Sequence, residues 1–226
     1  MSLPRDTPLV VGTDRRIELR RVAGLASMVF HAAAVALVLA LALGADRRTA
    51  AAVGPGVLWV ASLLAGTVGL GRLLERERRY GGWSALLLSP VSRTALFLGK
   101  STTLLVLILV TDAVLVPLVA LLFRLPEIYD HLAELALLLV AGAAGYALVA
   151  TLLGAIALQA RTGELLLGAV LYPLVIPILV GGVKGTVVLL GDGSLADLRP
   201  WLGLVLLGDA LFLVAGLWLF ESLTSE

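Results

Sequence analysis

The stretch STTLLVLILVTDAVLVPLVALLF, residues 101–123, is almost entirely apolar and contains one charged side chain, Asp112. A helix needs about 20 mostly apolar residues to cross the hydrocarbon core of a bilayer. The stretch is a continuous apolar run rather than an alternation of apolar and polar residues, which argues against a strand of a membrane barrel. It therefore predicts a transmembrane helix.

The composition extends this prediction to the whole chain of 226 residues. Hydrophobic residues make up 60% and charged residues 15%, and the mean hydropathy is +1.04, whereas soluble domains have about 45–50% apolar and about 25% charged residues. We expect an all-α integral membrane protein with six transmembrane helices in a single transmembrane domain, residues 1–226. The predicted spans are residues 22–45, 53–71, 101–123, 132–158, 165–182 and 201–220.

The distribution of Lys and Arg predicts the orientation. Twelve of these residues fall on the side that holds both termini, and five fall on the other side. Basic residues gather in cytoplasmic connections, so we expect a multi-pass protein of a bacterial or archaeal plasma (inner) membrane with both termini in the cytoplasm. The first apolar run is too long for the core of a signal peptide and is expected to be retained.

Two shorter segments flank the spans. Residues 13–22, TDRRIELRRV, suit a helix lying in the membrane interface or, equally, a basic flank that fixes topology. Residues 186–190, TVVLL, are too short to span the membrane. We expect them to form a re-entrant or interfacial helix on the outer side.

The tripeptide Gly99-Lys100-Ser101 matches the end of a phosphate-binding loop, G-x-x-x-x-G-K-[ST]. The first glycine of that motif is replaced by Thr94, and no hydrophobic strand precedes the segment. Nucleotide binding by this chain is therefore not expected, and Lys100 is expected to reach the membrane interface from the foot of the third span.

The connection after the second span carries the clearest candidate contact, a segment at residues 80–93. A short apolar piece there follows a Gly-Gly break and ends at Ser-Pro. An exposed apolar patch rimmed by charge usually marks a contact with another protein; the alternative is a turn packed on its own helices or on lipid. The candidate contact residues are Gly81, Gly82, Trp83, Ser84, Leu86, Leu87, Leu88, Ser89 and Pro90.

Three polar residues lie inside predicted spans: Asp112, Asp209 and His31. Ionisable groups at bilayer depth are costly and are candidates for a substrate path. The two aspartates could face one polar cavity in the outer half of the membrane, or each could be neutral and bonded locally. His31 could ligate an iron porphyrin, although a lone membrane histidine more often serves helix packing.

Other residues predict how the helices bend, pack and sit in the membrane. Pro117, Pro173 and Pro177 could kink the third and fifth spans, or form static bends. Small residues four apart, such as Ala141 with Gly145, predict close helix packing. The tryptophans expected to anchor the chain at the interface are Trp59, Trp201 and Trp218.

Several functions are disfavoured by what the sequence lacks. It has no cysteine and two histidines, so a metal site built by this chain is not expected. A net charge of +1 gives no basic field for nucleic acid. No catalytic arrangement of side chains is apparent, so the chain is not expected to be an enzyme.

Three segments, in this order, resemble the haem exporter protein B family, CcmB. They are GPGVLWVASLLAG at residues 54–66, the connection at residues 72–100 with its LLLSP, and ALQARTGELLLGAVLYPLVIPILVGGV at residues 157–183. The resemblance implies a fold like that of type II ABC exporters, with an N-terminal interfacial helix and a cytoplasmic coupling helix at residues 80–93.

The resemblance also implies partners and cargo. ATP would bind to a separate ATPase, CcmA, and further partners would be CcmC, CcmD and the haem chaperone CcmE, besides membrane lipid; a homodimer stays open. Haem would be the cargo and not a resident cofactor. The alternatives are a type II ABC permease for a lipid, drug or polysaccharide, and a scaffold that only assembles partners.

Overall fold

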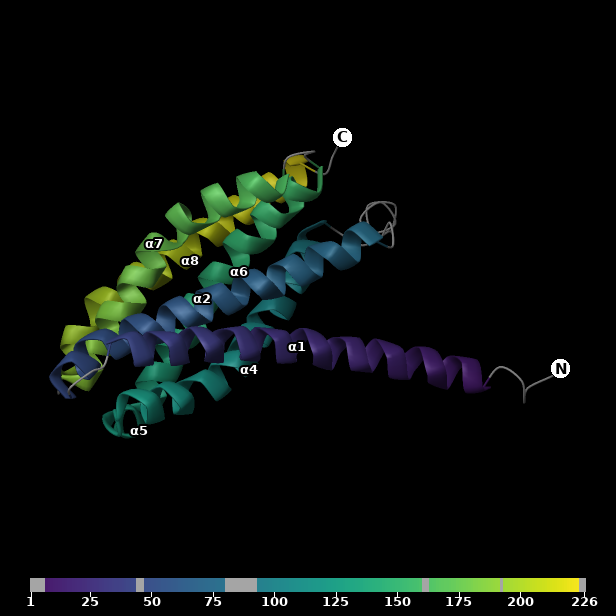
Figure 1. Cartoon of the computed structure of the whole chain (residues 1–226). Helices are drawn as coiled ribbons and strands as arrows, with labels where there is room; N and C mark the ends of the chain where they lie inside the picture. The colour runs from purple at the N-terminus through teal and green to yellow at the C-terminus, as the bar shows by residue number, and fades with distance from the viewer. Residues whose placement is uncertain (1–6, 44–46, 80–92, 160–162, 192, 224–226) are drawn as a thin grey trace.

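The computed structural model describes residues 7–43, 47–79, 93–159, 163–191 and 193–223, and in these ranges the chain is helical apart from short turns (Figure 1). Within these ranges six helices are long and apolar enough to cross a membrane, which confirms the predicted class. The helices are α1 Thr7–Leu43, α2 Arg47–Arg79, α4 Arg93–Phe123, α5 Glu127–Asp130, α6 Leu132–Gln159, α7 Gly163–Leu190 and α8 Leu195–Leu223.

Helix α6 occupies the centre of the bundle. It packs against α2, α4, α7 and α8, while α1 packs against α2 and α4. Of the most apolar stretch of α6, 72% is buried, compared with 17% for α1 and 17% for α8. The outer helices α1 and α8 therefore present most of their apolar surface to lipid or to partner chains.

The centre is held by Trp59 of α2, which inserts its indole ring between α6 and α7. A Cβ atom added at Gly142 of α6 or Gly182 of α7 would overlap the ring. The indole Nε1 donates a hydrogen bond of 3.0 Å to Thr186, whose hydroxyl donates to the carbonyl of Gly182. Trp59 is 2% exposed, so its prediction as an interfacial anchor was wrong: an indole needs one partner for its N–H, and a buried threonine supplies it.

The fifth span is longer than predicted. Helix α7 continues without a break to Leu190, so residues 186–190 are its last turn and not a separate re-entrant or interfacial helix. The glycines that suggested an end at residue 182 serve packing instead, because Gly185 faces the side chains of Leu138 and Leu198. Small residues permit this close approach within a helix.

The N-terminal segment, residues 13–22, is helical and joins the first span in one helix, α1. A helix of 37 residues spans roughly 56 Å at 1.5 Å per residue, and a hydrocarbon core is about 30 Å thick. Part of α1 must therefore lie outside that core, and its N-terminal part extends beyond the other helices (Figure 1).

The third span also begins earlier than predicted. Helix α4 starts at Arg93, eight residues before the predicted start at Ser101. It ends at a Schellman-type turn in which Leu125 N–H donates to the carbonyl of Ala120. Arg124 occupies the left-handed position with φ 53°, where glycine is usual. Leu125 then packs against Gly54 at the start of α2.

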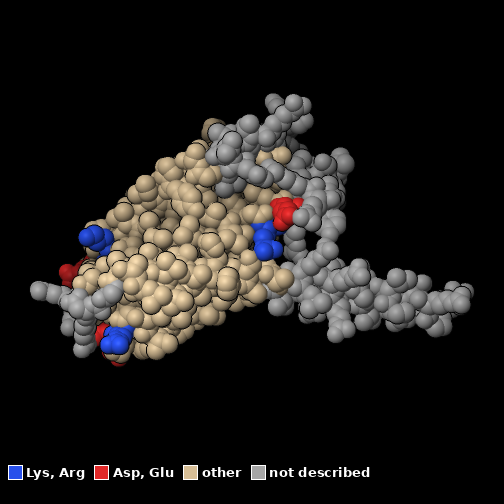
Figure 2. Space-filling view, in the orientation of Figure 1, with Lys and Arg blue, Asp and Glu red and all other residues tan. Residues whose placement is uncertain are grey.

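Charged side chains of the described residues gather at the two ends of the bundle. On the face shown in Figure 2 a wide uncharged band separates them, as a hydrocarbon layer requires. At one end lie Arg72, Glu75 and Lys100, and at the other lie Arg124, Glu127, Asp130, Glu134, Lys184, Asp197 and Arg199. Asp112 and Asp209 are the charged residues between these ends among those whose side chains are described.

The glycine contacts of Trp59 generate a test of the packing. We expect Gly182→Ala to destabilise the protein by about 1–3 kcal/mol, because the added methyl group must displace a rigid ring. Gly203→Ala on α8 is the matched control, since nothing lies within 4 Å of its Cβ position. The measurement is the thermal midpoint of the purified protein in detergent; equal midpoints for the two variants would contradict the packing described.

Candidate functional site

Besides the Trp59–Thr186 pair, the described part of the bundle contains four groups of polar side chains, which come from α2, α4, α6, α7 and α8. An unpaired polar group in an apolar environment costs several kcal/mol. Each group is therefore a candidate for a special role or a special packing arrangement. The groups are built around Thr67, Asp112, Asp209 and Lys100.

Thr67 of α2 joins three helices through hydroxyl groups. It donates to the carbonyl of Leu63 at 3.1 Å, and its oxygen lies 2.9 Å from the hydroxyl of Tyr146 on α6 and 3.2 Å from that of Tyr172 on α7. A hydroxyl has one proton and two lone pairs, so with its proton on Leu63, Thr67 accepts from both tyrosines. This arrangement uses the full hydrogen-bonding capacity of Thr67.

The Tyr146 ring lies directly on Gly66, one residue before Thr67. A Cβ at Gly66 would stand 2.6 Å from Cε1 of that ring. Tyr146 is 1% exposed, whereas Tyr172 is 39% exposed. The cluster thus runs from the centre of the bundle to the outer surface of α7.

Asp112 of α4 is 2% exposed. Ser62 of α2 is the hydroxyl side chain next to it, yet neither carboxyl oxygen has a partner in hydrogen-bonding geometry. Pro117 lies inside the same helix and leaves the carbonyl of Ala113 without its helical partner. A buried carboxyl group and a freed backbone carbonyl therefore occur at neighbouring positions of α4.

Asp209 of α8 lies where α6, α7 and α8 meet. Its carboxyl group occupies the space that a side chain at Gly145 of α6 would fill, and Ile178 of α7 flanks the same position. The residue is half-buried, and its Oδ1 is buried without a hydrogen-bond partner. Ser62 beside Asp112 lies on α2, whereas Asp209 meets α6 and α7, so one shared polar cavity remains a prediction.

His31 lies on the outer surface of α1. It is exposed, while its neighbours on the helix Met28 and Ala32 are each 1% exposed. Among the described residues, no three His, Asp or Glu side chains lie close enough to hold a metal ion. The suggested ligation of an iron porphyrin by His31 remains a prediction.

The segment predicted to contact a partner lies outside the described residues, apart from Arg93. Helix α2 reaches Arg79 on one side of it, and α4 begins at Arg93 on the other. The residues concerned are Gly81, Gly82, Trp83, Ser84, Leu86, Leu87, Leu88, Ser89 and Pro90.

The predicted kink residues all lie within helices: Pro117 in α4, and Pro173 and Pro177 in α7. All three are exposed. An interior proline breaks one hydrogen bond and bends a helix. On the outer surface of the bundle such bends meet no packing obstacle.

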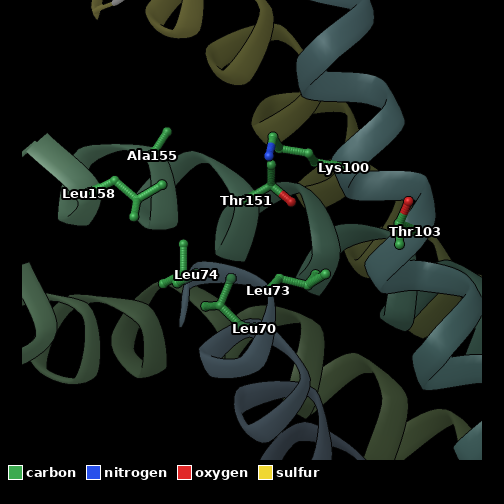
Figure 3. A pocket seen from close by; sticks show the side chains of 8 residues that line it. All are labelled: Leu70, Leu73, Leu74, Lys100, Thr103, Thr151, Ala155 and Leu158. Atoms are coloured by element: carbon green, nitrogen blue, oxygen red, sulfur yellow. The ribbon is translucent and has the colours of Figure 1, made fainter. Parts of the chain in front are cut away.

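Lys100 lines a cavity of about 180 Å³ between α2, α4 and α6 (Figure 3). Gly99, Lys100 and Ser101 lie inside α4, where the backbone N–H groups are engaged in the helix and cannot cradle a phosphate as a loop does. These three residues therefore do not form a phosphate-binding loop. The cavity is lined by Leu70, Leu73, Leu74, Lys100, Thr103, Thr151, Ala155 and Leu158.

Sequence reasoning missed the hydroxyl cluster and the insertion of Trp59. Tyr146 and Tyr172 are each the single tyrosine of an apolar run. The sequence of such a run does not indicate which group a tyrosine hydroxyl will bond to. A usable signal was available only at α6, where glycines at positions 142 and 145 indicate a helix that accepts large side chains from its neighbours.

Six apolar helices with charge at both ends, and with carboxyl and hydroxyl groups inside, define a multi-pass integral membrane protein. Within that class, the family model of the CcmB protein matches residues 8–220. The chain belongs to the CcmB family.

Two curated relatives have the same printed name, Heme exporter protein B. The protein of Pseudomonas aeruginosa is 31% identical over 175 residues, which cover 77% of each chain. The protein of Bradyrhizobium diazoefficiens is 29% identical over 180 residues, which cover 78% of this chain and 79% of that protein.

The hydroxyl cluster generates a stability prediction. Tyr146→Phe removes a buried donor to Thr67 and should cost about 0.5–1.5 kcal/mol. Tyr172→Phe should cost less, because Tyr172 is partly exposed. Thermal midpoints in detergent give the comparison; a larger loss for Tyr172→Phe would contradict the assigned order.

Proposed function

We propose that this chain is the membrane permease subunit of an ABC-type haem exporter that acts in cytochrome c maturation. The family match over residues 8–220 carries the proposal, together with the names of both relatives. Six long apolar helices fit a permease. In this role the chain has no enzymatic activity of its own, and ATP is hydrolysed on a separate subunit.

The segment at residues 80–93 is proposed as the contact with that ATPase. It connects α2 to α4, the helix that packs against α1, α2, α6 and α8. A displacement of the segment would therefore reach most of the bundle through one helix. Both termini and this segment are proposed to lie in the cytoplasm, in accordance with the distribution of Lys and Arg.

Further partners are proposed from the family: CcmC-like and CcmD-like membrane subunits, a CcmE-like haem chaperone, and a second copy of this chain. The weakly buried helices α1 and α8 offer surface for such contacts. Exposed apolar side chains on α8 include Leu207 and Trp218, at 69% and 76% exposure.

Asp112, Asp209 and His31 are proposed as substrate-path residues. For the two aspartates the support is energetic, since buried carboxyl oxygens without partners are retained at a cost. His31 is included because it is an ionisable residue inside a predicted span. A charged or hydrogen-bonding cargo, or a proton, would supply the missing partner. A scaffold role would make these groups dispensable, so Asp112→Asn and Asp209→Asn would leave c-type cytochrome formation unchanged.

The first experiment is deletion of the gene in its host, followed by haem staining of membrane proteins. We expect all covalent haem bands to disappear and to return when the gene is supplied in trans. Retained bands would remove haem maturation and leave a permease for another cargo as the better hypothesis.

A second prediction concerns the ATPase contact. Leu86→Asp or Leu87→Asp should abolish co-purification of the ATPase, because a carboxylate would be forced into an apolar contact. Leu132→Asp is the matched control, since Leu132 is exposed at the opposite end of the bundle. Unchanged co-purification of the ATPase with the Leu86 and Leu87 variants would disprove the contact.

A further inference from the structure

The carboxyl group of Asp112 is sealed inside the bundle. The residue is 2% exposed, and both carboxyl oxygens are buried without a hydrogen-bond partner. Asp209, in contrast, is only half-buried and has one such oxygen. A bulky molecule cannot reach the carboxyl group of Asp112 unless the helices around it separate, so a ligand of this group in the described arrangement must be small.

The basic residues that flank Asp112 along α4 are remote from it. Lys100 and Arg124 each lie 12 positions away in the sequence, which corresponds to roughly 18 Å at the rise of a helix. The other described Lys and Arg side chains also lie at the two ends of the bundle. None of these cations is placed to neutralise a carboxylate at the level of Asp112.

The helices that pack against α4 are α1, α2, α6 and α8, and their ionisable groups in the uncharged band are few. On α1, His31 is exposed on the outer surface. On α6, the hydroxyl of Tyr146 bonds to α2, and on α8 Asp209 is itself acidic. The polar group that α2 brings to Asp112 is the hydroxyl of Ser62, which is 5% exposed.

These surroundings favour the neutral form of the carboxyl group. A carboxylate without a compensating charge is so costly in an apolar interior that the group takes up a proton instead. A neutral carboxyl group has an O–H donor, and a serine oxygen can accept from it. Hard cations such as Ca²⁺ and Mg²⁺ take about six to eight oxygen ligands, far more than one carboxyl group and one hydroxyl supply.

We propose that Asp112 and Ser62 form a proton-binding site between α2 and α4, in which Asp112 is a neutral acid that donates its O–H to Ser62. This proposal names the ligand of one residue that the proposed function places on a substrate path, and its use in transport rests on that function. The bound proton joins the two helices that flank residues 80–92. Loss of the proton would leave a carboxylate between α2 and α4, and these helices would have to admit water to solvate it.

Infrared spectroscopy of the purified full chain tests the site directly, because a neutral carboxylic acid absorbs apart from carboxylates and backbone amides. Labelling of the aspartate carboxyl carbons with ¹³C identifies the aspartate bands by their isotope shift. We expect a neutral-acid band at neutral pH that is lost completely in Asp112→Asn and retained in Asp209→Asn, the matched control. Ser62→Ala should move this band to higher frequency, because loss of the hydrogen bond strengthens the C=O bond of the acid.

Asp209→Asn also decides the matter if Asp112→Asn fails to fold. Asp112 is then the remaining aspartate of the uncharged band among the residues whose side chains are described. A neutral-acid band in this variant supports the site, and its absence at neutral pH overturns it.

Three further results would overturn the proposal. An unchanged band in Asp112→Asn would show that Asp112 is ionised. Loss of the band when sodium chloride or calcium chloride replaces choline chloride would indicate a metal cation in place of the proton. An unmoved band in Ser62→Ala would show that Ser62 is not the acceptor. The spectrum does not depend on cytochrome formation, so the gene deletion and the infrared measurement can each fail alone.

Discussion

The insertion of Trp59 between α6 and α7 is the contact on which the rest of the bundle depends. Within a membrane, apolar side chains gain little by leaving lipid for one another, so helix association relies on close packing and hydrogen bonds. Trp59 supplies both, because its ring fills the space over Gly142 and Gly182 and its Nε1 bonds to Thr186. This contact fixes the separations of three helices, and α4 and α8 then pack on α6.

The polar groups of the interior follow from the same geometry. Where α6 lacks a side chain, a neighbouring helix brings in a larger one: Trp59 over Gly142 and Asp209 over Gly145. In the opposite direction, the ring of Tyr146 on α6 packs over Gly66 of α2. Thr67 then satisfies its own bonds fully, whereas the carboxyl groups of Asp112 and Asp209 retain oxygens without partners. The contrast separates a hydroxyl group whose hydrogen bonds are complete from carboxyl groups that keep oxygens without partners.

The number and class of the helices could be predicted from the sequence because run length and hydropathy are local properties. The end of the fifth span could not be predicted, since glycines such as those near residue 182 are typical both of turns and of closely packed helix interfaces. The role of Trp59 was missed for a related reason: an indole suits both the membrane interface and a buried site with one acceptor. Asp112 and Asp209 were recognised as unusual from charge alone, but their neighbours depend on the rotation of each helix.

The continuity of helix α4 affects how the helix can bend. Its 31 residues run from Arg93 to Phe123, and such a rod resists bending except where its ladder of hydrogen bonds is interrupted. Pro117 interrupts that ladder near Ala113, next to Asp112. A displacement of the Arg93 end would therefore move the helix as a rigid unit up to the position of Ala113. Bending of α4 would occur there, next to the buried carboxyl group of Asp112.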